Sequence, residues 1–570
     1  MSNDNSKTEI YLNPSAQKEN YIITPLLFTS KQTSYLQPMS SFSIDDIISR
    51  MNLKVVKRTQ RFSNTLHPMW RGMTNTPTDT VLVELSSDEA TQVQKNLPSN
   101  FSITKDTELS YGGPITRKQP YIKPFYLAEN TLTRKFQVRI IDQHEKPLNN
   151  IPVSLYGNAE GQYSNGITDD KGEVILEMQV SDKSNPRLLE VTPKDSYWDF
   201  SLLNPQMDEN NIYIVKLYSF ADNPTQTPLG WGQKLMGLDK LPKEINGAGV
   251  KIAIIDSGCD TTHPILKHIQ FGQNLTSNGN SSEWNTDTYG HGTHCAGIIA
   301  GYNEEYALRG FAPGAEVHIL KIFPDGTIKN FQDAITYCLE HQIDIVNMSL
   351  GTDSEILPGI EEYLAVAVQN GIACIVAAGN SGKTVSYPAS SPYTFAVAAI
   401  GDAKELKPNT PDLTTIQQGL VTADGIFSPN FTCFGPKIAV CAPGVDIISA
   451  AKDGKFVSMS GTSMAAPHIT GLAALLLAHH PLFQGQFRQR GPQRVSALFN
   501  LICSLCTPSP LGSNRTGAGL PKIDQIISFL QNKQSLYPEM PTVAAGYQIP
   551  SVITPQLRPE SYINTGYYFY

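Results

Sequence analysis

The sequence predicts an α/β fold with a doubly wound, mainly parallel sheet in residues 230–532, preceded by two smaller domains. From residue 230 onward, short β-branched runs alternate with alanine-rich runs of helical spacing, which is typical of buried parallel strands joined by crossover helices. Residues 21–111 follow the order strand, helix, strand, strand, helix, strand, and residues 132–219 show only the period of strands. A chain of 570 residues also exceeds one ordinary core.

The composition is that of a globular chain. Hydrophobic residues make up 40% and charged residues 17%, and the formal net charge is −8. No basic stripe stands out, so nucleic acid is not an expected partner. The most apolar run, at 471–478, is too short to span a bilayer, and the opening MSNDNSKTEI lacks the basic and apolar regions of a signal peptide. We therefore expect a cytoplasmic protein, or one exported by a route other than Sec.

The eight cysteines lie between residues 259 and 506. Without a visible signal peptide, they favour free, mostly buried thiols over disulfides. Cys503 and Cys506 form one C-x-x-C pair, but a single pair without further ligands is weak evidence for zinc. The sequence therefore predicts no metal site.

Residues 21–111 predict a ferredoxin-like α+β domain after a polar, disordered lead at 1–20. NYIITPLLF and DTVLVEL have the character of strands, and Ser86 with Glu89 forms a capping box before a second helix. The order of the elements is that of a split βαβ domain. A Gly/Pro-rich linker follows at 112–131.

Residues 132–219 predict an antiparallel β-sandwich. Segments such as KFQVRIID and GEVILEMQV alternate with period two, and turn signals such as HEKP and DDKG separate them. The run VRIIDQHEKPLNNIPVSLYG…GITDDKGEVIL resembles the carboxypeptidase-regulatory-like and Cna-B-like accessory modules, which implies a spacer or binding role. At the other end of the chain, residues 533–570 contain many Pro and Tyr without periodicity, and we expect a tail there.

Four polar residues lie where an α/β sheet exposes functional groups. Asp256 follows the strand-like run KIAII, and Asn380 ends the run IVAAGN. His291 and Ser463 each open a predicted helix among small residues. Functional groups in α/β proteins lie just beyond the carboxyl ends of strands, and a helix N-terminus favours negative charge. Each residue alone also fits a turn, a helix cap or a flexible loop.

These residues lie in the sequence motifs IIDSG, HGTHCAG, AAGN and GTSMAAPH, which occur in this order within residues 230–530. This set closely resembles the subtilisin-like serine peptidases, the subtilases of peptidase family S8. The resemblance implies a subtilisin-like sheet and a serine endopeptidase that works through an acyl-enzyme. By position, Ser463 would be the nucleophile, His291 the general base and Asp256 the residue that stabilises the imidazolium. Asn380 and the N–H of Ser463 would form the oxyanion hole.

The resemblance also implies a cleft for protein or peptide substrates. MSLG at 348–351 matches the edge segment that pairs with an extended substrate backbone. Small residues in this region imply a roomy, mostly apolar pocket and hence broad specificity. The residues expected to bind the substrate around the side chain that precedes the cleaved bond are Ser349, Leu350, Gly351, Ala378 and Gly379.

Three further residues belong to the same motifs. His294 and His468 are expected to support the structure. Cys295 occupies a position at which some subtilases carry a buried cysteine. A cysteine nucleophile is the rival interpretation, and the motif around Ser463 leaves it little weight.

The first domain resembles the propeptide that assists subtilase folding and then blocks the cleft. Its end, TKDTELSY, would lie in the active site with Tyr111 at the cleavage point, so the protein would be a precursor inhibited by its own N-terminal domain. In simple family members the propeptide adjoins the catalytic domain, whereas here the β-sandwich intervenes. The alternative is a regulatory domain that stays attached.

Two more departures from the family pattern concern calcium and an insertion. DTTHPIL has Ile265 where many subtilases have a calcium-binding carboxylate, and GYNEEYALRG has Glu304 where an amide is common. We therefore predict no cofactor and do not predict this calcium site, while a different calcium site stays open. Residues 404–426 form a polar insertion, which we expect to be a surface loop and a site for a partner or for autolysis.

Two other functions compete with peptide hydrolysis. In peptide transfer an amine resolves the acyl-enzyme, and this needs an element that shields the acyl-enzyme from water. No counterpart of such an element is identifiable in the sequence. A binding protein on an inactive protease scaffold is disfavoured, because a scaffold does not need all four polar residues.

Overall fold

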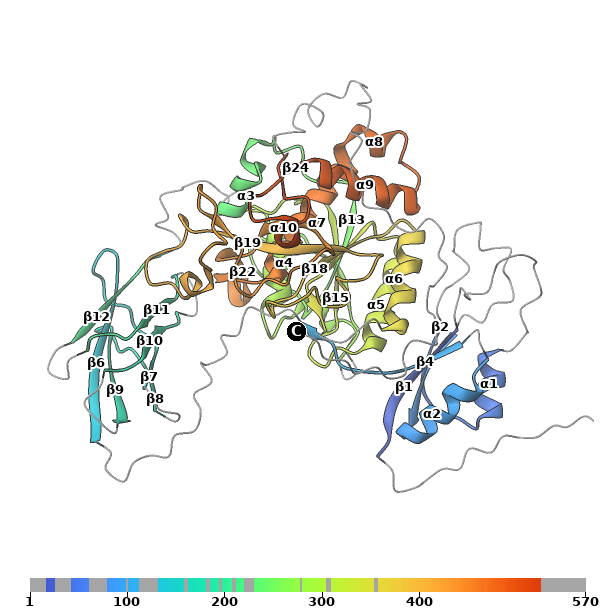
Figure 1. Cartoon of the computed structure of the whole chain (residues 1–570), viewed down its shortest axis with the longest axis horizontal. Coiled ribbons are helices and arrows are strands. Elements are labelled where there is room, and N and C mark those ends of the chain that lie inside the picture. Colours follow the sequence, from blue (N-terminus) through green and yellow to red (C-terminus); the bar gives the residue numbers. More distant parts are fainter. Residues whose placement is uncertain are drawn as a thin grey trace, which may run out of the picture.

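The structure is a computed structural model, and it describes residues 17–25, 43–60, 79–98, 101–111, 132–157, 162–180, 185–193, 197–207, 212–219, 230–276, 279–303, 309–352 and 357–523. Figure 1 shows a central body with a smaller body on either side. The predicted linker, most of the predicted lead and the predicted tail lie outside the described residues, as does Glu304.

The central body contains a mainly parallel sheet with the strand order β14-β15-β13-β16-β18-β19-β20, and β21 pairs with β19. All of its pairs are parallel except β19–β20. The predicted α/β fold with a mainly parallel sheet is therefore confirmed. The strands are β13 (Lys251–Asp256), β14 (Phe271–Asn274), β15 (Glu316–Lys321), β16 (Ile345–Met348), β18 (Ala373–Ala377), β19 (Phe395–Asp402), β20 (Ile426–Phe427) and β21 (Ile438–Pro443).

Helices cover both faces of this sheet, which explains why its inner strands are mainly apolar. Helices α4 and α7 pack against each other on one face, and α5 and α6 lie together on the other face (Figure 1). The helices of the central body are α3 (Trp231–Leu235), α4 (His291–Ala300), α5 (Ile328–Glu340), α6 (Pro358–Gln369), α7 (Thr462–His479), α8 (Pro481–Gln484), α9 (Pro492–Ser504) and α10 (Ser513–Thr516). Short 3-10 turns are η2 (Leu238–Lys240), η3 (Glu283–Asn285), η4 (Pro411–Thr415) and η5 (Lys452–Gly454).

Two small strand pairs complete the central body. An antiparallel hairpin of β22 (Ile447–Ala451) and β23 (Lys455–Met459) leads directly into α7. The second pair joins β24 (Cys506–Thr507) and β25 (Leu520–Pro521). None of the described helices is long and apolar enough to cross a bilayer.

The N-terminal body is a four-stranded antiparallel sheet of order β2-β3-β1-β4 with two helices. Ser43 and Ser86 each make a capping box, so the box predicted at Ser86 is confirmed. Strand β1 begins two residues before the predicted start of the domain. The elements are β1 (Glu19–Pro25), α1 (Ile44–Arg50), β2 (Val55–Gln60), β3 (Asp79–Leu85), α2 (Ser87–Asn96) and β4 (Phe101–Lys105).

Residues 132–219 contain two sheets, of order β11-β10-β7-β8 and β12-β6-β9, around a shared apolar core. The prediction that all pairs are antiparallel is wrong, because β12 pairs with β6 in parallel. Strands β10 and β11, which belong to the other sheet, lie between β9 and β12 along the chain. After them, β12 starts at the same end of the sheet as β6 and therefore runs parallel to it. The strands are β6 (Leu132–Asp142), β7 (Pro152–Tyr156), β8 (Tyr163–Ile167), β9 (Glu173–Val180), β10 (Leu188–Val191), β11 (Phe200–Leu203) and β12 (Tyr213–Leu217).

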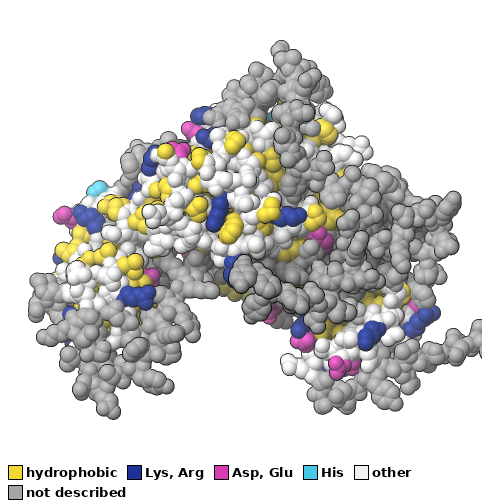
Figure 2. Space-filling model, viewed as in Figure 1, with side chains coloured by type: hydrophobic (Ala, Val, Ile, Leu, Met, Phe, Trp, Pro, Cys, Tyr) yellow, Lys and Arg dark blue, Asp and Glu magenta, His cyan; other side chains and the backbone are white. Residues whose placement is uncertain are grey.

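Both smaller bodies contact the central one. The N–H of Ser201 on β11 donates to the carbonyl oxygen of Asn409 at 2.5 Å, so the two-sheet body rests on the insertion 404–426. On the other side, the hydroxyl groups of Thr80 and Tyr363 lie 3.2 Å apart and are buried between β3 and α6. Figure 2 shows that hydrophobic, basic and acidic side chains of the described residues are interspersed on the visible face.

Candidate active site

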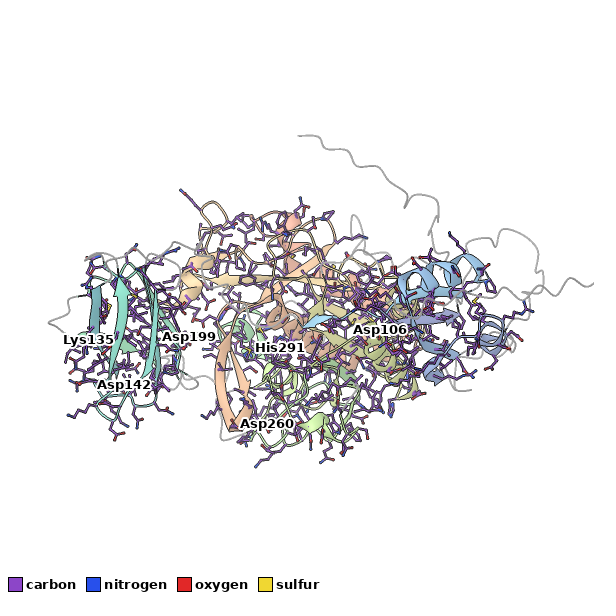
Figure 3. All side chains as sticks on the ribbon, turned by 90° about the horizontal axis from the view of Figure 1, so that it is seen from below. Asp106, Lys135, Asp142, Asp199, Asp260 and His291 are labelled. Carbon is purple, nitrogen blue, oxygen red and sulfur yellow. The ribbon has the colours of Figure 1, made fainter. Side chains whose placement is uncertain are left out.

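Asp256 and His291 form a buried pair at the centre of the molecule. Asp256 is the last residue of β13, and His291, which is labelled in Figure 3, is the first residue of α4. The Nδ1 atom of His291 lies 2.7 Å from Oδ1 of Asp256, and both side chains are fully buried. The N–H of Ser257 donates to the same carboxylate oxygen at 2.7 Å. The sheet edge thus holds the imidazole in one orientation.

Asp287 holds this pair in place, and the sequence analysis did not find it. Its carboxylate accepts hydrogen bonds from the hydroxyl of Ser257 at 2.9 Å and from the hydroxyl of Thr293 at 2.7 Å. It also accepts from the N–H groups of Tyr289, Gly290 and Thr293. Asp287 therefore joins the loop after β13 to the start of α4. Its one sequence signal is an Asp shortly before a helix start, where it can accept from backbone N–H groups.

Ser463 lies in the first turn of α7 and is fully buried. Pro467 has no N–H, so it cannot donate to the carbonyl oxygen of Ser463 four residues earlier. Instead, that oxygen accepts from the hydroxyl of Ser349 at 3.0 Å and from the thiol of Cys295 at 3.4 Å. Cys295 is one turn beyond His291 on α4. These two bonds connect α7 to α4, which carries His291, and to the segment after β16.

Asn380 follows β18 and lies against the start of α7. Its Oδ1 accepts from the N–H of Thr462 at 2.9 Å and from the hydroxyl of Thr462 at 2.8 Å. Its Nδ2 lies 3.2 Å from the place that a Cβ on Gly461 would occupy. The structure therefore brings Asp256, His291, Asn380 and Ser463 together at the carboxyl edge of the sheet, as the sequence indicated.

The five predicted cleft residues also lie along this edge. Leu350 and Gly351 form β17, and Ala378 and Gly379 follow β18. Ser386, which the sequence analysis missed, donates its hydroxyl to the carbonyl oxygen of Ala378 at 2.9 Å. A Cβ on Gly379 would come within 2.3 Å of this hydroxyl, and one on Gly351 within 3.3 Å. Ser386 thus forms part of the wall between the two glycines.

Comparisons with known proteins agree with this geometry. The model of the subtilase family, Peptidase_S8, matches residues 247–490. The major intracellular serine protease of Bacillus subtilis (strain 168) is 34% identical over 249 residues, which are 42% of this chain and 71% of that protein. The chain belongs to the subtilase family. Subtilisin NAT of Bacillus subtilis subsp. natto and subtilisin E of strain 168 are each 34% identical over 267 residues, which are 45% of this chain and 62% of each relative.

This subtilase is a subtilisin-like serine endopeptidase, which acts on proteins or peptides. The protonation of its motif residues distinguishes their roles. Burial raises the pKa of the Cys295 thiol well above its usual value, with Asp256 adding to the effect, so the group is a neutral thiol and a poor nucleophile. Burial lowers the pKa of His294 to about 3 and that of His468 to about 4. These two imidazoles are neutral and hydrogen-bond to backbone oxygens.

The residues of this subtilase do not fit the calcium site that many family members have. Ile265 stands at the position of the carboxylate ligand and is fully buried among apolar residues. The carbonyl oxygen of Ile265 accepts from the N–H of Tyr302 at 2.8 Å. Among the described residues, the one cluster with metal-ligand spacing is Asp256, His291 and Cys295, which belong to the site above. All eight cysteines are free, and six of them are buried.

The end of the N-terminal body lies along the edge formed by β17. Strand β5 (Ser110–Tyr111) pairs antiparallel with β17, so that Tyr111 lies opposite Leu350 and Ser110 opposite Gly351. On its other side, the N–H of Leu109 donates to the carbonyl oxygen of Gly326 at 2.7 Å. The Leu109 side chain is 5% exposed and belongs to the core of the central body.

The segment before β5 is anchored at the start of α5. The N–H of Ile328 donates to the carbonyl oxygen of Thr107 at 3.1 Å, and the N–H of Lys329 donates to Oδ1 of Asp106 at 2.9 Å (Figure 3). A carboxylate at the first turn of a helix is favourable, because the N–H groups there have no partners within the helix. Residues 106–111 therefore lie as an extended strand between two segments of the central body.

Proposed function

We propose that Ser463, His291 and Asp256 form the catalytic triad of this endopeptidase. The hydroxyl oxygen of Ser463 attacks the peptide carbonyl while His291 takes its proton, and Asp256 stabilises the resulting imidazolium. His291 then gives the proton to the leaving amine, and water resolves the acyl-enzyme. The observation that carries the proposal is the 2.7 Å contact between His291 and Asp256 beside the helix that begins at Thr462 and carries Ser463 in its first turn.

We further propose that Asn380 and the N–H of Ser463 stabilise the oxyanion. The two donors of Thr462 occupy Oδ1 of Asn380, which supports the use of Nδ2 as the donor to substrate. The N–H of Ser463 lies at the start of a long helix, where the macrodipole favours negative charge. Donors held in position before the reaction are effective because they do not have to reorganise as charge develops.

We propose a broad, mostly apolar preference for the residue before the cleaved bond. Ser349, Leu350, Gly351, Ala378 and Gly379 would bind the substrate here. The wall beside the substrate is made of small residues, because Ser386 packs against Gly351 and Gly379 and its hydroxyl donates to the carbonyl oxygen of Ala378. No charge of the described pocket wall would select a basic side chain.

We also propose that the N-terminal body is an intramolecular inhibitor of the ferredoxin-like type, as in a self-inhibited precursor. Its sheet order β2-β3-β1-β4 and its two helices support the fold assignment. The pairing of Tyr111 with Leu350 supports the inhibitory role, since an extended substrate would use the same edge. Processing at Tyr111 would release this domain. The two-sheet body would be the accessory β-sandwich.

We propose a cytoplasmic location for the enzyme. The likeness to a relative named as an intracellular serine protease supports it.

The mass spectrum of the products tests the proposed function. We expect the chain, once limited proteolysis has removed residues 1–111, to convert a peptide substrate to two fragments that together gain one water. Ser463→Ala should abolish these products, and Ser282→Ala, at an exposed serine of the same domain, should leave them unchanged. Cyclic or amine-extended products would instead indicate peptide transfer. Absence of Ser463-dependent products would support an inactive scaffold.

A further inference from the structure

A cavity of about 580 Å³ lies between the β-sandwich and the central body. Strands β10 and β11 form its outer wall, and η4, β23 and the residue after β23 form its inner wall. The β-sandwich lies outside the part of the chain that matches the subtilase family, and η4 belongs to the insertion 404–426. The cavity therefore lies where the β-sandwich meets the predicted insertion and neighbouring parts of the stretch that matches the subtilase family.

The walls of this cavity are acidic. Glu190 and Asp199 line it from the β-sandwich, and Asp412 and Asp446 line it from the central body. Figure 3 shows Asp199 on the side of the β-sandwich that faces the central body. None of the described residues that line the cavity is Lys, Arg or His. Four carboxylates therefore line the cavity, and all of its charged described lining residues are acidic.

Asp446 shows most directly that a partner is missing from this arrangement. Its side chain is 3% exposed, and its Oδ1 accepts a short hydrogen bond from the hydroxyl of Ser458. Its Oδ2 is buried and has no hydrogen-bond partner in the described structure. A buried carboxylate oxygen without a donor is costly, so such groups are normally paired. A donor entering the cavity would supply the missing bond.

We propose that this cavity binds an ammonium or guanidinium group, carried by a small amine or by a Lys or Arg side chain of a peptide. Such a group donates several hydrogen bonds and neutralises the acidic wall. A bare divalent ion fits less well, because the carboxylates of the cavity do not form a cluster with metal-ligand spacing among the described residues. The volume suits an organic ligand, since small-molecule sites usually exceed about 300 Å³.

Hydrogen bonds of Ser460 link the cavity to the chain just before Ser463. The hydroxyl of Ser460, which lines the cavity, donates to Oδ1 of Asp412 at 2.7 Å and accepts from the N–H of Asp446 at 2.8 Å. Ser460 is three residues before Ser463. A cation bound by Asp412 and Asp446 would therefore alter the support of the first turn of α7. We expect binding of the cation to change the peptidase rate, and this expectation rests on the proposed function.

A change in the protonation of Asp446 should accompany cation binding and can be measured. Burial raises the pKa of Asp446, and the neighbouring Asp412 and Asp199 raise it further, while the Ser458 donor and Lys407 oppose this effect. A bound cation stabilises the ionised carboxylate, so binding should release a proton. The affinity should then increase as the pH rises through the range in which Asp446 of the empty cavity titrates.

Calorimetry on the full-length Ser463→Ala chain tests binding without self-digestion. The probes are agmatine, cadaverine and N-acetyl-lysine amide, with N-acetyl-norleucine amide as the uncharged analogue and CaCl₂ as the divalent ion. We expect the cationic probes to bind with proton release and the uncharged analogue not to bind. Tighter binding of N-acetyl-lysine amide would indicate a peptide side chain as the natural ligand, and tighter binding of the free amines would indicate a small amine.

Substitutions locate the site. Asp446→Asn keeps the shape of the side chain and should weaken probe binding about ten- to a hundredfold, the effect expected for losing a charged hydrogen-bond partner. Glu190→Gln changes the opposite wall and should also weaken binding, even if Asp446→Asn fails to fold. Glu177→Gln, at an exposed position on β9, is the matched control and should change nothing.

Three results would overturn the proposal: no binding of any cationic probe, equal binding of the uncharged analogue, or calcium binding in place of amine binding. Binding that is insensitive to both Asp446→Asn and Glu190→Gln would also overturn it. The rate of the wild-type chain at saturating agmatine is measured separately. An inactive wild type that still shows probe binding in calorimetry would contradict only the proposed function.

Discussion

Thr462 orients the side chain of Asn380. Both the N–H and the hydroxyl of Thr462 donate to Oδ1 of Asn380. An amide fixed in this way presents its NH₂ group on the other side, toward Gly461. A single residue of the serine motif thus orients the donor that follows β18.

Removal of this amide should reduce turnover with little effect on substrate binding. In an enzyme of the subtilisin type, loss of the oxyanion-hole asparagine lowers kcat about 100- to 1,000-fold, and we expect the same range for Asn380→Ala. The KM should stay nearly unchanged, because the bond to the amide forms in the transition state. Steady-state kinetics on a peptide substrate measures both constants. Asn149→Ala, at an exposed position on the two-sheet body, should match wild type.

A substitution at Ser386 tests which residue the enzyme prefers before the cleaved bond. Ser386→Asp should raise kcat/KM for substrates with Lys before the cleaved bond, relative to Phe, by about tenfold or more. The reason is that a hydrogen bond between charged groups contributes about 1.5–3 kcal/mol. Paired kinetics on two peptides that differ only at this position measures the ratio. Ser386→Asn keeps the size without the charge and should leave the ratio near that of wild type.

At the scale of residues, the sequence indicates the candidate site residues but not the residues that hold them in position. Asp256, His291, Asn380 and Ser463 each lie in a motif whose residue types and order are informative. Asp287 carries no motif, and its role appears once the loop after β13 and the start of α4 are brought together. Ser386 lies beside Gly379 and Gly351 only because the fold brings these three residues together. No local sequence pattern indicates this contact.

At the scale of elements, the start of α4 depends on close packing against the loop after β13. A Cβ on Gly292 would lie 2.1 Å from the carbonyl oxygen of Gly258 and 3.1 Å from the Cβ of Asp256. The helix that carries His291 can therefore approach the Asp256 loop this closely because residue 292 has no side chain. The distance between the imidazole and the carboxylate depends on this contact.

Gly292→Ala should disturb both stability and activity. The new methyl group overlaps backbone that cannot move aside cheaply, so we expect a loss of about 1–3 kcal/mol in the free energy of unfolding. We expect kcat to fall at least tenfold, since His291 must shift. Denaturant unfolding and kinetics measure the two effects. Gly359→Ala on α6 meets the tips of side chains, and a comparable loss in that variant would contradict this explanation.

Elements with a complete local signal were predictable from the sequence. The apolar run after Ser463 indicated the helix to His479, and the capping box at Ser86 marked the start of α2. Strands β8 and β11 were not predicted, because their sequences YSNGI and FSLL are short and lack clear alternation. The parallel pairing of β12 with β6 depends on how the chain returns, which no local pattern records.

At the scale of the whole molecule, buried neutral histidines set the response to acid. His294 and His468 are fully buried, and their folded-state pKa values of about 3 and about 4 lie below the ordinary value of 6.5. Between these limits the unfolded chain binds protons that the folded chain does not, so stability must fall as the pH falls. Each of the two should remove about 2–3 kcal/mol by pH 4.5.

Unfolding of Ser463→Ala at pH 7.5 and pH 4.5 measures this loss. We expect a clearly lower Tm at pH 4.5 and a smaller difference in His468→Gln, which cannot gain a proton in this range. The same Tm at both pH values would show that these histidines are not held neutral in the folded state.

The arrangement of the three bodies is the least predictable feature of this chain. The polarity of residues 404–426 predicts a surface loop that serves as a site for a partner or for autolysis, and in the structure Asn409 of this segment accepts a hydrogen bond from Ser201 of the two-sheet body. Polar segments that bind another domain and polar segments that face solvent have similar composition. The path of residues 106–111 across the cleft was suggested by resemblance, and its anchoring at the start of α5 follows from the structure.

The rate of fluorophosphonate labelling, followed by intact mass, tests most directly whether Ser463 is an activated nucleophile in a cleft occupied by its own chain. Four full-length proteins are compared: wild type, Leu109→Asp, Ile175→Asp and Ser463→Ala. Leu109→Asp places a charge in the buried position that anchors the strand, whereas Ile175 is exposed on β9.

We expect Leu109→Asp to gain the mass of one probe faster than wild type, Ile175→Asp to match wild type, and Ser463→Ala to gain none. Labelling of Ser463→Ala, or equal rates for wild type and Leu109→Asp, would contradict the account.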